Sequence, residues 1–198
     1  SIDFSWITVP APLAKMAVLE ALDGGIKHLV LYPERLPQQD MLEIVEYAKK
    51  LGAMVIGPNS IGVLSPGQAV IGTIGGTMEM KKDVFLRGSA GIISRSGGMT
   101  TSTAFEITKS GVGETTVIGI GGDAFIGTTP VDLLPLFEQD PETKMVVMFG
   151  EIGTSHEENA ADYIKEGRFT KPVVAYIAGR HAREGMRFGH AGAIVEEG

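Results

Sequence analysis

An apolar run that leads through a hydroxyl- and glycine-rich turn into a helical pattern stands near the middle of the chain, at Ala90-Gly91-Ile92-Ile93-Ser94-Arg95-Ser96-Gly97-Gly98-Met99. The run at 90–93 is typical of a buried parallel strand, and the pattern over 99–110 is typical of a helix. A strand that passes directly into a helix is half of a βαβ unit, from which helix-covered parallel sheets are built. The stretch therefore predicts an α/β fold with doubly wound parallel sheets.

The same alternation continues toward the C-terminal end of the sequence. We expect further strands at 116–120, 145–149 and 173–178, and helices at 130–139 and 156–166. Four parallel strands with intervening helices predict a flavodoxin-like domain over residues 89–198.

A second α/β pattern lies on the N-terminal side. We expect strands at 6–9, 28–32 and 53–56, and helices at 13–22 and 40–51. Three strands are few for a free-standing doubly wound sheet, so residues 1–66 are expected to be the C-terminal part of a Rossmann-like domain. Residues 57–88 are rich in glycine and proline, which predicts loops and short strands there, with 67–88 connecting the two domains.

Composition limits the classes of function. The 198 residues are 43% hydrophobic and 21% charged, which excludes a disordered chain and a coiled coil. The net charge of −7 argues against a general nucleic-acid binder. Since no apolar run approaches the roughly 20 residues that cross a bilayer, no membrane partner is expected. The absence of cysteine excludes disulfides and a thiolate nucleophile, and it fits a cytoplasmic protein.

Candidate functional residues follow the strands, because doubly wound sheets bind ligands beyond the carboxyl ends of their strands. The turn Ser94-Arg95-Ser96-Gly97 either caps the next helix or cradles a phosphate on backbone N–H groups. It matches neither GxxxxGK[ST] nor GxGxxG, which disfavours a P-loop nucleotide hydrolase and an NAD dehydrogenase. A flavin protein is disfavoured as well, because the loop contains Arg95 and only two hydroxyl groups.

Two more glycine-rich segments follow predicted strands. They are Gly121-Gly122-Asp123 and Gly150-Glu151-Ile152-Gly153, and each taken alone is typical of a turn. Glu151, however, comes directly after an apolar strand, where a carboxylate needs a partner. A histidine is the obvious candidate.

The chain has four histidines. His28, His156 and His181 are expected to be packed or solvated. His190 lies between small residues, in Gly189-His190-Ala191-Gly192, which leave its imidazole uncrowded. It is either another packed or solvated side chain or a nucleophile toward phosphoryl groups, in which a carboxylate fixes one ring N–H while the other nitrogen attacks.

Five glycine-rich motifs occur in order along the chain. They are Gly57-Pro58-Asn59-Ser60-Ile61-Gly62, Ser94-Arg95-Ser96-Gly97, Gly119-Ile120-Gly121-Gly122-Asp123, Gly150-Glu151-Ile152-Gly153 and Gly189-His190-Ala191-Gly192-Ala193-Ile194. With Val9-Pro10-Ala11-Pro12 and Thr170-Lys171-Pro172-Val173-Val174, they resemble the α subunit of succinyl-CoA synthetase and the matching part of ATP-citrate lyase. The resemblance covers essentially the whole chain.

This resemblance implies an acid–CoA ligase that couples a small carboxylic acid, CoA and ATP or GTP through an enzyme phosphohistidine. His190 matches the phosphorylated histidine and Glu151 its hydrogen-bonding glutamate. The family pattern further implies a phosphate-binding helix start at Ser94, Arg95, Ser96 and Gly97, CoA-binding residues at Tyr32, Pro33, Glu34, Asn59 and Ser60, and acid-substrate residues at Thr101, Gly122 and Asp123. The nucleotide and Mg²⁺ would be held mostly by an ATP-grasp β subunit, so no metal site, flavin or NAD is expected in this chain.

The sequence also departs from the family pattern. Many relatives carry Cys-Pro in place of Ser60-Ile61, and Thr101 replaces a tyrosine that is associated with succinate. The glycine-rich loop for the CoA phosphates would precede Ser1. The segments Ile71-Gly72-Thr73 and Glu166-Gly167-Arg168 resemble ATP-citrate lyase and citryl-CoA synthetase more closely. The five motifs as a whole make succinate the first expected acid. These departures favour citrate as the alternative, and a non-catalytic CoA- or nucleotide-binding module is the alternative of another class.

Overall fold

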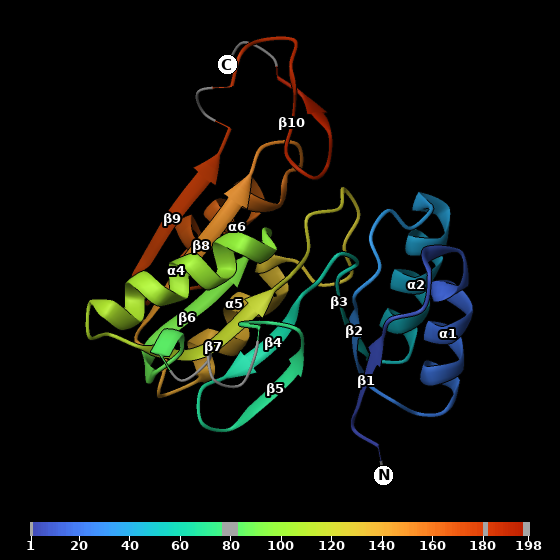
Figure 1. Cartoon of the computed structure of the whole chain (residues 1–198), viewed down its shortest axis with the longest axis horizontal. Coiled ribbons are helices and arrows are strands. Elements are labelled where there is room, and N and C mark those ends of the chain that lie inside the picture. Colours follow the sequence, from blue (N-terminus) through green and yellow to red (C-terminus); the bar gives the residue numbers. More distant parts are fainter. Residues whose placement is uncertain (1, 77–82, 180–181, 196–198) are drawn as a thin grey trace.

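The computed structural model describes residues 2–76, 83–179 and 182–195, and it contains two α/β units (Figure 1). The first has a parallel sheet of three strands in the order β1 (Phe4–Ile7), β2 (His28–Leu31) and β3 (Met54–Ile56). Helices α1 (Ala11–Asp23) and α2 (Gln38–Lys50) connect these strands and cover one face of the sheet. Two right-handed crossovers that run in the same direction place both helices on that face.

Burial explains why these segments are helices and strands. In α1 the buried residues are Ala14, Val18 and Leu22, one helical turn apart, so the helix has a single apolar stripe toward the sheet. Strand β2 is buried at three consecutive positions, Leu29 to Leu31, as expected for a strand covered on both faces.

The second unit has a six-stranded sheet in the order β5-β4-β7-β6-β8-β9. Its strands are β4 (Gly62–Ser65), β5 (Ala69–Gly72), β6 (Arg87–Ser94), β7 (Glu114–Gly119), β8 (Met145–Glu151) and β9 (Val173–Ala178). The parallel strands β7-β6-β8-β9 have the order of a flavodoxin-like sheet. The predicted α/β class with parallel sheets is confirmed.

Helices cover both faces of this sheet. Helix α4 (Gly97–Lys109) lies on one face, and α5 (Pro130–Gln139) and α6 (His156–Lys165) lie on the other (Figure 1). Neighbouring residues of β6 point to opposite faces of the sheet. Ile92 packs in the apolar cluster that contains Ala104 of α4, and Ile93 packs in the cluster that contains Leu133 of α5. The cluster with Leu133 also includes Val30 and Ile56 of the first unit, so an apolar core joins the two units.

The division of the chain between the two units differs from the expected one at strands β4 and β5. They form an antiparallel hairpin that pairs with β7, so the change from one sheet to the other falls between Ile56 and Gly62. The expected boundary at residue 66 falls after β4. Leu64 explains the assignment, because it is buried against Ile92 and Val117 of the second core.

The other expected elements are confirmed, with ends that shift by a few residues; β9 and α5 have the expected bounds. A short hairpin of β10 (Arg187–Phe188) and β11 (Ala193–Ile194) was not expected. His181 lies outside the described residues. None of the described helices combines the length and the apolar character needed to cross a membrane.

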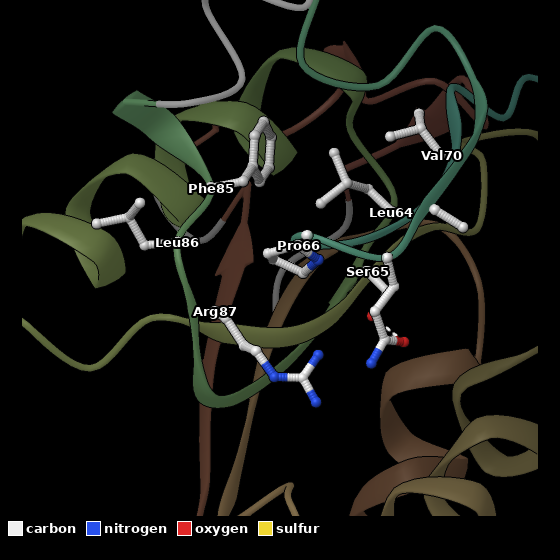
Figure 2. Close-up of a pocket in the computed structure, with 10 residues that line it drawn as sticks. Leu64, Ser65, Pro66, Val70, Phe85, Leu86 and Arg87 are labelled. Carbon is white, nitrogen blue, oxygen red and sulfur yellow. Dashed lines mark hydrogen bonds between the residues drawn. The ribbon is translucent and has the colours of Figure 1, made fainter.

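A cavity of about 670 Å³ opens where the parallel strands of the second sheet begin (Figure 2). It is lined by the β4–β5 hairpin and by residues 85–87, and its wall is largely apolar, with Leu64, Pro66 and Phe85. Its charged residue, Arg87, pairs with Glu142 at 2.7 Å. The candidate site lies at the other end of the same strands.

Candidate active site

The carboxyl ends of three adjacent strands bring the candidate residues together. In the sheet register Ser94 of β6 lies beside Gly119 of β7 and Phe149 of β8. The segments that follow these strands therefore converge at one edge, as expected for a doubly wound sheet.

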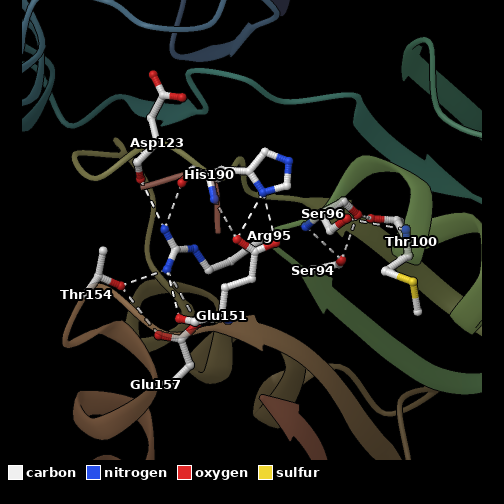
Figure 3. A network of polar contacts seen from close by, with 11 residues as sticks. Ser94, Arg95, Ser96, Thr100, Asp123, Glu151, Thr154, Glu157 and His190 are labelled. Carbon is white, nitrogen blue, oxygen red and sulfur yellow. Dashed lines mark hydrogen bonds and ion pairs between the residues drawn. The ribbon is translucent and has the colours of Figure 1, made fainter. Parts of the chain in front are cut away.

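His190 and Glu151 form a direct pair at this edge (Figure 3). Glu151 is 5% exposed, and its Oε1 lies 2.8 Å from Nδ1 of His190. Its Oε2 accepts the backbone N–H of His190 at 3.0 Å. Because a carboxylate accepts hydrogen bonds, this geometry favours the tautomer with the proton on Nδ1. Nε2 points away from Glu151, and none of the described residues forms a hydrogen bond with it (Figure 3).

His190 lies in the turn of the β10–β11 hairpin, which positions it beside Glu151. Gly189 precedes the histidine with φ of 71°, in the left-handed region that glycine adopts readily. A Cβ on Gly189 would lie 2.9 Å from Oε2 of Glu151. A Cβ on Gly122 would lie 2.5 Å from Cγ of His190, which is too close for van der Waals contact. Small residues thus allow the backbone of two loops to approach the pair.

Helix α4 begins directly after the turn at the end of β6, at the same edge of the sheet as this pair. Ser96 is the N-cap residue, and its hydroxyl accepts the N–H of Met99 at 3.5 Å. Gly97 and Gly98 are the first two helical residues, whose N–H groups have no acceptor within a helix. Ser94 is buried, and its hydroxyl donates to the carbonyl of Ser96 at 3.0 Å. Ser94 therefore shapes the turn, while the helix start offers N–H groups to an anion.

Arg95 turns inward. Its side chain is 1% exposed, and its guanidinium donates to the carbonyls of Gly122 at 2.9 Å and Glu151 at 3.3 Å. It also donates to Thr154 Oγ1 at 2.9 Å and lies 3.7 Å from a carboxylate oxygen of Glu157. Thr154 and Glu157 were not expected as site residues. An acidic residue in a first helical turn is ordinarily a response to the helix dipole, so no local signal distinguished Glu157.

A second group forms where the two units meet. Asp123 accepts the backbone N–H of Arg35 at 2.8 Å, and Asn59 donates its backbone N–H to the Pro33 carbonyl at 2.8 Å. Tyr32 is exposed and packs edge-to-face on Trp6.

Burial raises the pKa of the Asp123 carboxyl, against the lowering effect of the hydrogen bond from Arg35. Glu34 is exposed in the same loop. The expected CoA-binding segments thus lie beside Asp123, next to the histidine site.

Two expected residues have other surroundings. Ser60 is 1% exposed, and its hydroxyl donates to the carbonyl of Gly119 at 2.5 Å and accepts the N–H of Gly62 at 3.0 Å. Ser60 therefore uses its hydroxyl for hydrogen bonds inside the protein, which connect the segment after β3 to β7 and β4. Thr101 lies in α4, half-buried, one turn beyond Gly97.

His156 lies near the buried guanidinium at the start of α6. Burial first, and then the charge of Arg95, lower the pKa of its imidazole. Within residues 2–76, 83–179 and 182–195, no three histidine or acidic side chains are grouped closely enough to hold a metal ion.

Comparison with known proteins identifies the family. Residues 93–198, more than half of the chain, match the CoA-ligase family. The chain belongs to the CoA-ligase family. The resemblance noted from the five motifs is therefore confirmed.

Individual relatives of this CoA-ligase chain cover nearly all of it. It is 50% identical over 194 residues to a succinate–CoA ligase [ADP-forming] subunit alpha 2 of Archaeoglobus fulgidus, covering 98% of this chain and 65% of the relative. It is 44% identical to the ADP-forming sulfoacetate-CoA ligase subunit SauD of Bilophila wadsworthia, covering 99% of this chain and 66% of the relative. The chain thus spans just under two thirds of the length of these curated relatives.

A solved structure has the same fold. ATP citrate lyase from Methanothrix soehngenii, in complex with citrate and coenzyme A, superposes with a TM-score of 0.92 at 29% identity. The match covers 98% of this chain and 33% of that chain.

Proposed function

We propose that this chain is part of the α-type subunit of an ADP-forming acid–CoA ligase, with His190 as the phosphoryl carrier. One observation carries the proposal: Glu151 binds both the backbone N–H and Nδ1 of His190, so that Nε2 points away from the carboxylate, at the sheet edge where α4 begins. Relatives named as α subunits of succinate–CoA ligases, 42–50% identical over nearly the whole chain, support it.

In the proposed reaction, Nε2 of His190 carries the phosphoryl group. The Nε2 lone pair attacks the γ-phosphorus of a nucleoside triphosphate, and the bond from phosphorus to the β-phosphate oxygen breaks to release the diphosphate. A carboxylate oxygen of the acid then takes the phosphoryl group from Nε2, which gives an acyl phosphate. The thiol of CoA adds to the acyl carbon, phosphate departs with the thiol proton, and the thioester remains. Each step is reversible.

Two features of the chain assist the phosphohistidine. Glu151 holds Nδ1–H and thereby keeps Nε2 as the attacking nitrogen. The N–H groups at Gly97 and Gly98, with the dipole of α4, favour the negative phosphoryl group by up to about 2 kcal/mol in a partly buried site.

CoA is expected to bind the first unit at Tyr32, Pro33, Glu34 and Asn59, beside Asp123. The family, and the coenzyme A complex of ATP citrate lyase, support CoA binding. ATP or GTP with Mg²⁺, which neutralises the triphosphate, is assigned to an ATP-grasp β subunit. The α-subunit names of the relatives support a partner subunit. The cytoplasmic location stays a prediction.

Succinate is the first acid proposed, because several relatives that are 45–50% identical over nearly the whole chain are succinate–CoA ligase subunits. Citrate is the second candidate, favoured by the TM-score of 0.92 with ATP citrate lyase. A panel of succinate, citrate, malate, acetate and sulfoacetate, assayed for CoA thioester formation with the partner subunit present, decides between them. Thioester formation with succinate alone supports the first proposal, and formation with citrate alone overturns it.

Phosphorylation itself is tested with γ-labelled ATP and the assembled full-length enzyme. We expect acid-labile, base-stable label on this chain and none after His190→Asn. Equal labelling of wild type and His190→Asn contradicts the assignment. A chain that never labels and never co-purifies with a nucleotide-binding partner supports the non-catalytic module instead.

A further inference from the structure

Arg95 places a buried positive charge among three loops (Figure 3). It follows β6, and its donors reach the segments after β7 and β8. A guanidinium carries five N–H donors in a rigid planar fork, so one side chain can set the spacing of several loops. Its side chain is 1% exposed, which leaves it no direct access to a phosphate in solution.

Glu157 supplies the opposite charge from the first turn of α6. Its carboxylate is 3.7 Å from Nη1 of Arg95, and its side chain is 9% exposed. The exposed pair of Arg87 and Glu142 joins side chains that are about half exposed. Because desolvation makes a buried ion pair expensive, such a pair depends on further hydrogen bonds to both groups.

Two of those further hydrogen bonds, one from each partner of the ion pair, involve the backbone of Glu151. Oε1 of Glu157 accepts the backbone N–H of Glu151 at 3.1 Å, and Nη1 of Arg95 donates to the backbone carbonyl of Glu151 at 3.3 Å. The peptide groups on both sides of the Glu151 Cα are therefore held by one ion pair. With its backbone fixed, Glu151 directs its carboxylate to Nδ1 and to the backbone N–H of His190.

The packing around this arrangement leaves it little freedom. A Cβ on Gly150 would lie 2.6 Å from Cγ and Oε1 of Glu157, so the strand end closes directly on that carboxylate. Thr154 donates to Glu157 Oε2 at 3.4 Å and accepts from Arg95 at 2.9 Å, which bridges the two charges.

We infer that Arg95 and Glu157 are positioning residues for phosphoryl transfer: acting through the backbone of Glu151, they aim its carboxylate so that His190 keeps its proton on Nδ1 and its lone pair on Nε2. This inference rests on the proposed function of His190. Both side chains are buried, at 1% and 9% exposure, so neither is assigned a contact with the phosphoryl group. Their effect is on the tautomer and the orientation of the imidazole.

The first test replaces Arg95 with Lys in the full-length subunit assembled with its partner. Lysine keeps the charge but loses the planar fork, so the Glu151 carbonyl and Thr154 cannot be held together. We expect phosphohistidine formation to slow at least about tenfold, and ¹⁵N shifts of His190 to show a mixture of Nδ1–H and Nε2–H tautomers. The matched control, Arg87→Lys, makes the same change in the exposed ion pair and is expected to leave both readouts unchanged.

The second test asks whether the effect passes through Glu151. In an Arg95→Lys/Glu151→Gln double variant, phosphorylation should be no slower than in Glu151→Gln alone. Glu157→Gln, which keeps an oxygen acceptor for the Glu151 N–H but removes the charge, repeats the cycle if Arg95→Lys does not fold. Independent effects that multiply in the double variant overturn the inference.

The outcomes separate the two proposals. Absence of label on His190 in the wild type overturns the proposed function. Label in the wild type, with unchanged rates and tautomer in Arg95→Lys and Glu157→Gln, overturns only the positioning role. A lower unfolding temperature with an unchanged rate per folded molecule also overturns it, since Arg95 and Glu157 would then be structural only.

Discussion

At the scale of single residues, the site depends on the contact between His190 and Glu151. The carboxylate is buried and binds two groups of the histidine, whereas the imidazole stays 43% exposed. A fixed Nδ1 and an accessible Nε2 are what a phosphoryl carrier requires.

Replacing Glu151 with Gln removes the negative charge and one of the two acceptor oxygens. We expect His190 phosphorylation to slow by about 10- to 100-fold, the range that corresponds to a hydrogen bond with a charged group. Rapid-quench labelling with γ-labelled ATP measures this rate. Glu158→Gln, an exposed neighbour in α6, is the control for the change in charge, and equal slowing in both variants contradicts the role of Glu151.

Gly189 permits a sharper comparison. Gly189 and Gly185 both have positive φ, of 71° and 74°, so alanine is strained to a similar degree at either position. Only at Gly189 does the added Cβ approach Glu151, at 2.9 Å from Oε2, whereas at Gly185 it meets open space. We expect Gly189→Ala to slow phosphorylation at least about tenfold through loss of a charge-assisted hydrogen bond, and Gly185→Ala to leave the rate unchanged. Similar rates in the two variants would exclude this steric explanation.

At the scale of elements, β7 begins with a buried acid. Glu114 is fully buried and accepts a hydrogen bond from Thr108 at 2.9 Å, while its Oε2 has no partner among the described residues. Burial raises the pKa of this carboxyl from 4.5 to about 7. It therefore keeps a proton in the folded protein that the unfolded chain has already released near neutral pH.

This difference predicts a loss of stability as the pH rises. Between pH 4.5 and about 7 the unfolded state binds fewer protons, so the contribution of Glu114 to the free energy of unfolding falls by up to about 3 kcal/mol. In Glu114→Gln this contribution is absent. Urea denaturation of wild type and variant at pH 5 and pH 8 measures the difference.

Glu106→Gln, at an exposed position on α4, is the control, and its free energy of unfolding is expected to change with pH as in the wild type. If the free energies of unfolding of wild type and Glu114→Gln changed by the same amount between pH 5 and pH 8, the raised pKa would be contradicted.

At the scale of the whole molecule, the two α/β units meet through an apolar core and a few polar contacts. Val30 and Ile56 pack into the core of the second unit. Ser60 binds the Gly119 carbonyl, Thr128 binds the Val55 carbonyl at 2.8 Å, and Asp123 binds the Arg35 N–H. Asp123 is the contact that joins the histidine site to the loop expected to hold CoA.

Removing this contact should weaken CoA binding. Arg35 has φ of 59°, an unfavourable conformation for a residue other than glycine, and Asp123 supports it by accepting its N–H. We expect Asp123→Ala to lower CoA affinity about tenfold, as for the loss of one charge-assisted hydrogen bond. Calorimetric titration of CoA into the assembled enzyme measures the affinity. Asp162→Ala, an exposed acid on α6, is the control, and equal affinities in the two variants contradict the contact's role.

The sequence predicted well what depends on local pattern. The bounds of α5 follow from Pro130 at its start and from Leu133, Leu134 and Phe137 on its buried face. The sequence predicted poorly the features that depend on pairing between strands far apart in the chain. Strand β4 alternates buried and half-buried residues in the way a strand of either sheet would, and only its pairing with β7 assigns it to the second sheet. The two-residue strands of the β10–β11 hairpin are too short for any alternation to be visible.

By itself, the sequence determined the α/β rhythm, the placing of glycine-rich segments at strand ends, and which residue types were available there. Tertiary structure decided which of them meet. Glu151 and His190 lie 39 residues apart, and their contact depends on a hairpin folding back over the end of β8. Arg95 and Ser60 were expected at a ligand, yet both point into the protein, because a buried strand end needs donors for its carbonyls. That demand comes from the packing of neighbouring segments, which the chain's local pattern does not contain.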